Sequence, residues 1–525
     1  MQRGALARYG ISALMWISLA ERPLLIDELC HALAVETEPL NIDPEMVPPI
    51  ATVVASCMGL ITIDHASSTV RLVHATLKEY LCSHQHSVFR DPHAIIAEVC
   101  LSYLSIQSVR EILPCLQTAS VPHEFPFLGY ASCHWGAHAQ KELTVRVRQL
   151  ALGILDHIQH VVVHISLFEG EEMWRWGSWG GHYAGLSGLH YVAYFGLNEI
   201  LEKLLGMGQG DLNSRDWRNR TPLYLAAARG NEVVVKTLLN CPDVNPNAQN
   251  YNWETPLFQA CKNGHEGVVR TLLSHTDTDP NLVDGFDRTP LFEASDSGHE
   301  ELVRILLSHA DIKPSLTYGN HLTALLRAAE NGHEGVVRIL VSHADVDPNL
   351  TNLSDQTALP RAARNGHEGV VRILLSRGDV NPNLSNLFGQ TALFLAAING
   401  YEGVVGILLS RADVNPNFVT TYGETPLFRA AANGHEGVVR ILLSRADVDP
   451  NLINWRGQTP ISLAGENGHE GVVRILLSRA DVNPNLTDQH GQTPLSRAAE
   501  NYHWGIVRML RSHTNANSGL GHQHN

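Results

Sequence analysis

One short segment of this sequence recurs at a fixed interval, and this period constrains the fold more than any other feature. A threonine, followed by Pro or Ala and then by Leu or Ile, returns every 34 residues. The nine copies begin at Thr221, Thr255, Thr289, Thr323, Thr357, Thr391, Thr425, Thr459 and Thr493. A divergent copy begins one interval earlier, at Ser187, which makes ten. A fixed period of this length is typical of units that stack into a solenoid.

Each unit is predicted to form two short helices. Thr425 can accept the free N–H groups at the start of the first helix, and Pro426 loses no hydrogen bond there. Gly434 ends this helix because it adopts the left-handed conformation that side chains resist. The second helix then presents one apolar face, made of Val438, Val439, Leu442 and Leu443. The sequence therefore predicts helix pairs that bury these faces by stacking.

The unit from Thr425 to Ser444 resembles the ankyrin-repeat consensus: Thr-Pro-Leu-Phe-Arg-Ala-Ala-Ala-Asn-Gly-His-Glu-Gly-Val-Val-Arg-Ile-Leu-Leu-Ser. Tetratricopeptide repeats share the period, but the Trp-Leu-Gly-Tyr pattern of that family is missing here. The resemblance implies an all-α ankyrin-repeat solenoid, built of helix-turn-helix units with short β-hairpin loops. We place the ten repeats at 186–514 and a flexible tail at 515–525.

Several positions depart from the family pattern or add to it. The glycine that usually closes the second helix is an alanine, as at Ala446, so we expect the following Asp449-Pro450-Asn451 to stop the helix. Pro360 removes an N–H group that Thr357 could cap, which predicts that the sixth repeat is the weakest. On the solvated side, Glu436 and Arg440 stand four apart in the order that favours an ion pair.

The N-terminal residues have no period and predict a different fold. Two short helices interrupted at Pro23 are followed by a hairpin, in which Ile61 and Ile63 alternate on one strand, and then by a helix from Thr76. This order suggests a winged-helix domain at 1–90. Its nine acidic residues against six basic ones argue against binding of DNA.

The same region resembles the winged-helix segment of fungal NACHT-ankyrin proteins, which is also seen in GPI inositol-deacylase-like proteins. The residues that carry the resemblance are Arg71-Leu-Val-His74 and Tyr80-Leu, and it continues through Phe125–Ala131 and His134–His138. The family implies a helical connector at 91–185. The phosphate-binding pattern G-x-x-x-x-G-K-[ST] is missing, so we expect a family member that lacks the NACHT module and binds neither ATP nor GTP.

Composition narrows the class of protein further. The chain has 525 residues and a formal charge of −15, which argues against nucleic acid as a partner. Its eight cysteines show no C-x-x-C pair, as expected of reduced, buried thiols in an intracellular protein. The apolar stretch at 11–19 is too short to span a bilayer, and it does not read as a signal peptide. We expect a cytoplasmic protein, with a nuclear location left open.

The sequence predicts no catalytic residues, no cofactor and no metal site. G-x-S-x-G and H-E-x-x-H are missing, and Gly206-Met-Gly208-Gln-Gly210 reads as a loop. The histidines after the turn glycine recur once per repeat, too far apart to share a metal, and are interpreted as structural. Trp174, Trp176 and Trp179 are interpreted as packing residues and not as a binding patch. His522 and His524 are interpreted as solvated residues and not as metal ligands. We therefore expect no enzyme activity and no small-molecule substrate.

Binding is expected where the copies differ. The connecting hairpin tips precede each threonine by three or four residues, and several carry aromatic side chains: Trp217, Tyr251, Phe286, Phe388, Tyr422 and Trp455. Exposed aromatics are favoured as interface anchors, although packing between tips would need the same residues. A second variable column lies four residues after each threonine, and its arginines are expected to form a positive strip for an acidic partner segment: Arg327, Arg361, Arg429 and Arg497.

Two functions fit these features. The first is a protein-protein interaction scaffold from a signalling family related to fungal NLR-like receptors, without nucleic-acid or membrane binding. The alternative is a regulatory or substrate-adaptor subunit of a separate enzyme, either an NTPase or a ubiquitin ligase. The partner that co-purifies with the chain would distinguish the two.

Overall fold

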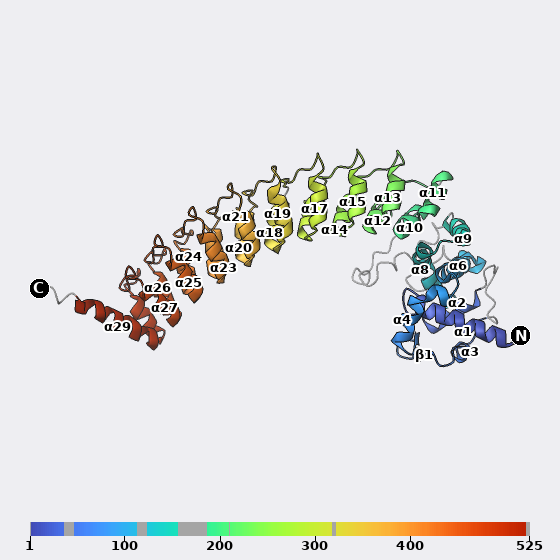
Figure 1. Ribbon diagram of the computed structural model, residues 1–525, viewed down its shortest axis with the longest axis horizontal. Helices are drawn as coiled ribbons and strands as arrows, with labels where there is room; N and C mark the ends of the chain where they lie inside the picture. The colour runs from blue at the N-terminus through green and yellow to red at the C-terminus, as the bar shows by residue number, and fades with distance from the viewer. Residues whose placement is uncertain are drawn as a thin grey trace. The chain divides into compact units, whose positions relative to one another are not determined.

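The computed structural model describes residues 2–35, 47–112, 123–155, 186–208, 210–317 and 322–520, and gives the backbone alone at 2–7 and 515–520. The chain forms two compact units, Met1–Thr278 and Asp279–Asn525. Helices dominate both units (Figure 1). The predicted all-α class is therefore confirmed.

The first unit begins with a winged helix. Its elements are α1 Gln2–Leu19, α2 Ile26–Ala34, α3 Ile50–Ser56, β1 Ile61–Asp64, β2 Thr69–Leu72 and α4 Ala75–Ser83. The strands pair antiparallel, with Ile61 opposite Leu72, and a single bridge joins Leu25 to Thr69. The predicted order of helices and hairpin is confirmed. Helix α3, which carries no charged residue, was not predicted from the sequence.

Four helices and one short turn of helix follow the winged helix. They are α5 Gln85–Val88, α6 Pro92–Ser105, α7 Gln107–Ile112, α8 Leu128–Lys141 and α9 Val145–Leu155. An aromatic cluster joins them to α1, since the Trp16 ring meets Phe127 edge-on at 5.5 Å between centroids. On the other side of α8, Trp135 stacks on Tyr191 of the first repeat at 4.9 Å. The first unit thus has one continuous core from the winged helix to the repeats.

Each repeat forms a helix pair. In the first unit these are α10 Gly188–Phe195 and α11 Asn198–Gly206, α12 Pro222–Ala228 and α13 Glu232–Leu239, and α14 Pro256–Lys262 and α15 Glu266–Leu273. In the second unit they are α16 Pro290–Asp296 and α17 Glu300–Leu307, α18 Ala324–Asn331 and α19 Glu334–Ser342, α20 Ala358–Asn365 and α21 Glu368–Leu375, α22 Ala392–Asn399 and α23 Glu402–Leu409, α24 Pro426–Ala432 and α25 Glu436–Leu443, α26 Pro460–Glu466 and α27 Glu470–Leu477, and α28 Pro494–Glu500 and α29 Trp504–Leu520.

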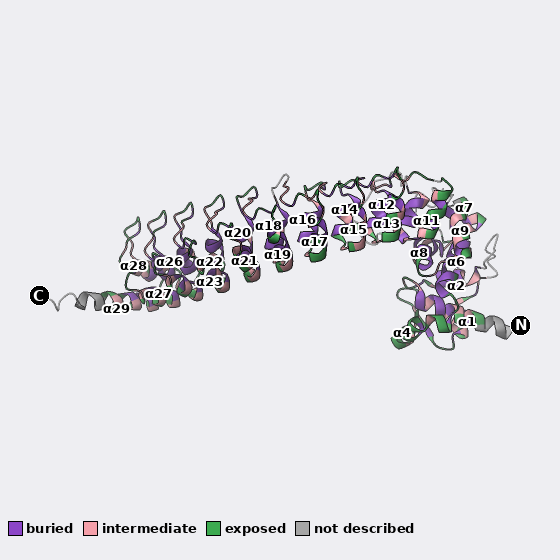
Figure 2. Cartoon of the chain, turned by 45° about the horizontal axis from the view of Figure 1, so that its top comes forward, coloured by how far each residue is buried: buried purple, intermediate pink, exposed green. Residues whose placement is uncertain are grey.

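The helix pairs form two layers within each unit. First helices pack on first helices, as α20 does on α22, and second helices pack on second helices, as α23 does on α25. Their facing sides are buried, and the connecting loops are largely exposed (Figure 2). The final helix α29 extends to Leu520, which lies inside the segment that the sequence predicted to be a tail.

The threonine caps form as predicted. Thr425 Oγ1 accepts a hydrogen bond from the Phe428 N–H at 3.1 Å, and the same bond recurs in the other described repeats that begin with threonine except one. The exception is Thr357, whose partner position holds Pro360. The missing cap of the sixth repeat is therefore confirmed, and its weakness stays a prediction.

Replacing Pro360 with leucine should stabilise the second unit by about 1 kcal/mol, because Thr357 regains an N–H group to cap. The fifth repeat already holds Leu326 at this position, where its N–H bonds to Thr323 at 3.1 Å. Urea unfolding of the full chain measures the change. A matched Leu326→Pro substitution should lower stability, and equal behaviour of the two variants would contradict the cap argument.

The predicted end of the second helices is wrong. Helix α25 ends at Leu443, six residues before Asp449, so Pro450 is not what stops it. The Ser444 hydroxyl instead donates to the Ile441 carbonyl at 2.6 Å, and the Arg445 guanidinium donates to the Leu409 carbonyl of the preceding second helix at 3.4 Å. Arginine thus replaces the missing glycine by binding carbonyl groups of its neighbour.

The ion pair predicted between Glu436 and Arg440 does not form. The Glu436 side chain lies over Gly471 in the next second helix, where a side-chain carbon would collide with its carboxylate. Glu470 lies in the same way over Gly505. Glu436 and Glu470 therefore contact the neighbouring repeat, and neither forms an ion pair with the arginine four residues after it.

Asparagines join successive repeats on the loop side. The Asn383 side chain donates to the Asp413 carbonyl at 2.7 Å and accepts from the Asn415 N–H at 2.8 Å. The same pair of bonds recurs at Asn349, Asn417 and Asn451. Each asparagine satisfies two main-chain groups of the next repeat, which holds adjacent loops at a fixed spacing.

The recurring histidines are structural, as predicted. His435 Nε2 contacts the Ile398 carbonyl at 3.0 Å, at the end of the preceding first helix, and its ring covers Gly400. The same contact recurs at His265, His333, His367, His469 and His503. Each ring closes the junction between two repeats.

Candidate functional site

The hairpin tips owe their shape to one side chain in each loop. Asn454 Oδ1 accepts from the Arg456 N–H at 3.0 Å and from the Gln458 N–H at 2.9 Å, which folds the tip into a tight turn. Gly457 completes the turn with φ of 75°. Asn386 forms the same two bonds in the seventh repeat. The residues between asparagine and glycine are thereby presented to solvent.

Five of the six predicted tip aromatics are exposed. Their exposed fractions are 70% for Tyr251, 74% for Phe286, 56% for Phe388, 53% for Tyr422 and 60% for Trp455. The sixth, Trp217, is half-buried, and the guanidinium groups of Arg218 and Arg220 lie 4.5 Å and 5.9 Å from its ring centroid. Trp217 is therefore not placed as an exposed anchor.

Other exposed apolar residues on the tips were missed. Trp253 is 62% exposed and has φ of 63°, a backbone conformation that tryptophan rarely adopts. It lies two residues before its threonine, whereas the predicted tip positions lie three or four residues before it. The sequence prediction named aromatic residues alone, so it omits four exposed aliphatic residues: Leu353, Leu387, Val419 and Ile453.

Main-chain hydrogen bonds join neighbouring tips. The Thr421 N–H donates to the Phe388 carbonyl at 3.0 Å, and the Trp455 N–H donates to the Tyr422 carbonyl at 3.0 Å. In the first unit the Tyr251 N–H donates to the Arg218 carbonyl at 3.1 Å. The tips of the seventh, eighth and ninth repeats are therefore held in one register.

The arginine column is not a strip of free positive charge. Arg327 pairs with Asp296 at 2.6 Å, and Arg361 pairs with Glu330 at 2.6 Å. Each carboxylate comes from the preceding repeat, at the position seven residues after its threonine. These contacts neutralise the arginines, so the expectation of a positive strip is wrong.

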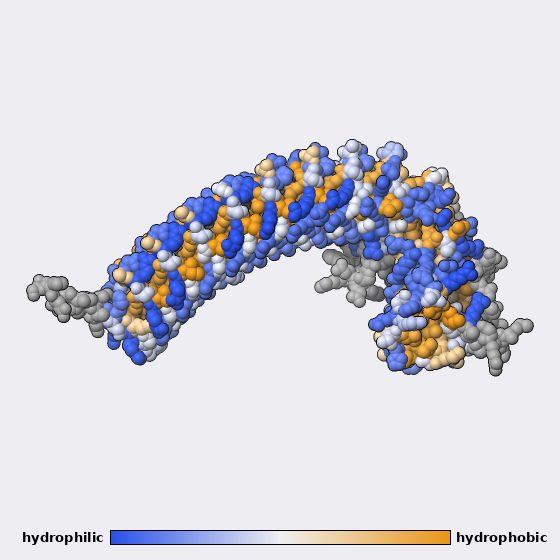
Figure 3. Space-filling model, in the orientation of Figure 1, coloured by the Kyte–Doolittle hydropathy of each residue, from blue (hydrophilic) through white to orange (hydrophobic). Residues whose placement is uncertain are grey.

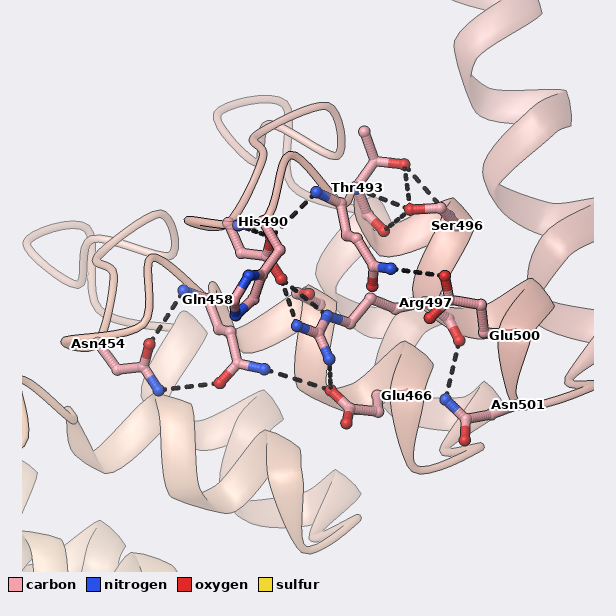
Figure 4. A network of polar contacts seen from close by, with 12 residues as sticks. Asn454, Gln458, Glu466, His490, Thr493, Ser496, Arg497, Glu500 and Asn501 are labelled. Carbon is pink, nitrogen blue, oxygen red and sulfur yellow. Dashed lines mark hydrogen bonds and ion pairs between the residues drawn. The ribbon is translucent and has the colours of Figure 1, made fainter.

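The other two arginines are also paired. Arg429 contacts Glu424 of its own tip at 2.8 Å. Arg497 contacts Asp488 of its own tip and Glu466 of the preceding repeat (Figure 4). Burial lowers the pKa of Arg497, but the hydrogen bonds that its guanidinium donates to Asp488 and the charges of the neighbouring carboxylates outweigh burial, so the pKa is raised. Each arginine of the column is thus paired with a carboxylate of its own tip or of the preceding repeat.

The cysteines only partly match the expectation of buried thiols. Among the described cysteines five are buried, while Cys82 is exposed and Cys241 is half-buried. Burial raises the pKa of Cys30 and of Cys133 to about 11, which keeps both protonated.

The remaining expectations from the sequence concern a glycine-rich loop, five residues of uncertain role, metal ligands and membrane spans. Gly206 ends helix α11, and Gly208 and Gly210 follow it in a loop, as predicted. Trp174, Trp176, Trp179, His522 and His524 lie outside the described residues. In the described ranges, no three His, Cys, Asp or Glu side chains gather as metal ligands would. Every helix in those ranges is too short or too polar to cross a lipid bilayer.

Comparison with known families gives two matches. The model described as "Ankyrin repeats (3 copies)" matches residues 189–284, 235–318, 272–352, 291–386, 361–454 and 446–519. The model described as "GPI inositol-deacylase, winged helix domain" matches residues 3–90. A comparison with curated proteins gave no significant match. Since the overlapping ankyrin matches run from residue 189 to residue 519, more than half of the chain, this protein belongs to the ankyrin-repeat family.

Proposed function

We propose that the chain is a protein-protein interaction scaffold that binds its partner through the hairpin tips. The observation that carries the proposal is the set of exposed aromatics on tips that are joined in register. Trp455 and Tyr422 each leave more than half of their surface in water. Large aromatic side chains are costly to expose and are the residues that most often anchor an interface.

The attachment of the tips also supports binding. Ankyrin repeats generally mediate protein-protein interaction, and the tips here have little freedom to lose. Asn454 fixes its own turn, and the hydrogen bond from the Trp455 N–H to the Tyr422 carbonyl links that turn to the tip of the preceding repeat. A surface that is already ordered loses less entropy on binding, so more of the contact energy remains as affinity.

Replacing Tyr422 and Trp455 together with alanine should abolish capture of the partner from native lysate. Both side chains project into solvent, so the thermal melt should change little. Affinity-tagged full-length chain and mass spectrometry of the captured proteins measure the effect, which should reach at least tenfold.

A second aromatic pair provides the control. Tyr502 and Trp504 are 77% and 59% exposed but lie at the turn of the last repeat, away from the tips. Their double alanine variant should capture the partner as the unmodified chain does. Capture that survives in the Tyr422/Trp455 variant would show that the tips are not the site.

We further propose that the chain derives from a signalling family related to fungal NACHT-ankyrin receptors, in which the array serves as a sensor or docking arm. The match at 3–90 to a winged helix of the GPI inositol-deacylase type, ahead of ankyrin repeats, supports this order of domains. The boundaries 1–90, 91–185, 186–514 and 515–525 and a cytoplasmic location belong to the same proposal. Recovery of an ATPase or a ubiquitin ligase with the chain would favour the adaptor alternative.

A further inference from the structure

Three junctions of the second unit share one polar contact on the first helices. In each, the acid seven residues after one threonine meets the arginine four residues after the next threonine. The pairs are Asp296–Arg327, Glu330–Arg361 and Glu466–Arg497. Charges that are already paired on the surface contribute little to a new contact, because binding must replace interactions that exist in the free chain.

The three junctions in between lack this pair. The residues at the same two positions are Arg364 with Leu395, Ile398 with Arg429, and Ala432 with Leu463. Leu395 and Ala432 are buried, while Ile398 and Leu463 are half-buried. We call these four residues the apolar floor. Salt-bridged junctions thus flank these four residues, and the arginine between them, Arg429, is paired with Glu424 of its own tip.

A free cation lies beside the apolar floor. The Arg364 side chain is exposed, and no carboxylate of the described residues lies within ion-pair distance of it. Arg361 and Arg327, one and two junctions away, are both paired. Arg364 therefore keeps its charge available for a ligand, and a guanidinium binds a carboxylate with two parallel hydrogen bonds.

The exposed tips of the same three repeats carry Phe388, Tyr422 and Trp455. The contact of Glu424 with Arg429 joins the base of a tip to the column that contains the apolar floor. Tip aromatics and apolar floor thus occur in the same repeats, although they arise at different positions of the unit. In the space-filling view, apolar and polar bands alternate along the repeats of the second unit (Figure 3).

We propose that the seventh to ninth repeats bind a peptide segment of the partner that carries apolar anchors and one carboxylate, with the anchors on the apolar floor and the carboxylate on Arg364. The proposal rests on the proposed function and names the ligand class of that site. Apolar anchors match the carbon side chains of the apolar floor. One unpaired arginine beside the floor favours a single carboxylate over the many phosphates of nucleic acid or of an anionic lipid surface, which bind to clustered basic residues.

A random library of twelve-residue peptides displayed on phage, selected on the full-length chain, tests the proposal. Selected peptides should combine aromatic or long aliphatic residues with Asp or Glu at a constant offset. A fluorescein-labelled synthetic copy of the most enriched peptide then gives Kd by anisotropy. Arg364→Gln should weaken its binding at least tenfold, and the matched variant Arg327→Gln should leave Kd within twofold.

A double variant tests the apolar floor itself. Ala432→Glu with Leu463→Arg recreates the pair formed by Glu466 and Arg497, which this array already accommodates. It should keep the thermal melt and weaken peptide binding at least tenfold. If it does not fold, Ile398→Gln replaces it, with the same expected loss.

The outcomes separate this inference from the proposed function. Enrichment of basic peptides, no enrichment, binding of a second copy of the chain in place of peptide, or an unchanged Kd in these variants would overturn the inference. In that case the Tyr422/Trp455 variant should still lose its partner from lysate if the proposed function is right. If that variant keeps the partner, the proposed function fails as well.

Discussion

Lowering the pH from 7.5 to 5 should destabilise the first unit by about 4 kcal/mol. Half of this loss comes from His134 on α8, and half from His138, which lies in a buried chain of hydrogen bonds that links α6 and α8 to Glu21 after the end of α1. His93 Nδ1 contacts His138 Nδ1 at 2.8 Å, and the Tyr130 hydroxyl contacts His138 Nε2 at 3.0 Å. The Glu21 N–H donates to the Tyr130 oxygen at 3.1 Å, so this hydroxyl is free to donate to His138.

Both histidines must be neutral for this chain to form. If Tyr130 donates to Nε2 of His138, then His138 carries its proton on Nδ1 and donates it to His93. A second proton on either ring would place two N–H groups face to face or remove the acceptor of Tyr130. Protonation is therefore incompatible with the observed contacts.

The direction of the pH effect follows from the pKa values. Burial, with the neighbouring His93 and Lys141, lowers the pKa of His138 from its ordinary value of 6.5 to about 2. Burial and then Arg22 lower the pKa of His134 to about 4. The unfolded chain binds protons at these histidines that the folded chain does not bind. Their contribution to the free energy of unfolding is therefore fully present above pH 6.5 and is lost as the pH falls below it. Each of these two histidines contributes about 2 kcal/mol of loss by pH 5.

Urea unfolding at both pH values, followed by tryptophan fluorescence, measures this loss. The buried rings of Trp16 and Trp135 report on this core. The control variant His138→Gln should be less stable at pH 7.5, because it leaves hydrogen-bonding groups unsatisfied, but should lose less between pH 7.5 and 5. If the urea midpoint for unfolding of the first unit is the same at pH 7.5 and at pH 5, the account is contradicted.

Replacing Gly434 with alanine should destabilise the second unit by about 3 kcal/mol. Gly434 has φ of 76°, where a side chain costs about 1–2 kcal/mol. In addition, a Cβ there would lie 2.6 Å from Nδ1 of His469, so the ring must move away from the Ala432 carbonyl that it contacts at 3.0 Å. A lost hydrogen bond of this kind costs about 1 kcal/mol more.

The same substitution at Gly378 should have the opposite sign. No atom lies within 4 Å of a Cβ built there, and its φ is outside the left-handed range. Four of the neighbouring repeats hold alanine at this position: Ala344, Ala412, Ala446 and Ala480. Gly378→Ala should stabilise by about 0.5 kcal/mol, because it restricts the unfolded chain. Equal effects of the two variants on the urea midpoint would contradict the stacking described for His469.

The fold could be predicted because its determinants lie close together in the sequence. The cap of Thr425 and its loss at Pro360 involve residues three apart. The contacts between repeats join residues about one period apart, and these were missed. Arg361 and Glu330 are such a case, because a repeated arginine looks like free charge until its neighbour is placed beside it.

The site was predicted only in part, for the same physical reason. An aromatic on a tip is exposed unless its neighbours cover it, and Trp217 is half-buried although Trp455 at the same position of its repeat is exposed. Trp253 was missed because its left-handed backbone is not visible in residue type. The apolar floor became recognisable only when the ion pairs on both sides of it were known.

Hydrogen exchange of the full-length chain, with and without the selected peptide, tests the central claim most directly. Exchange should slow at the tips and first helices of the seventh to ninth repeats, within residues 386–398, 420–432 and 454–466. The winged helix at 3–90 and the second helices of the array should exchange as before. Protection confined to the winged helix or to the second helices, with none at the three tips, would contradict the account.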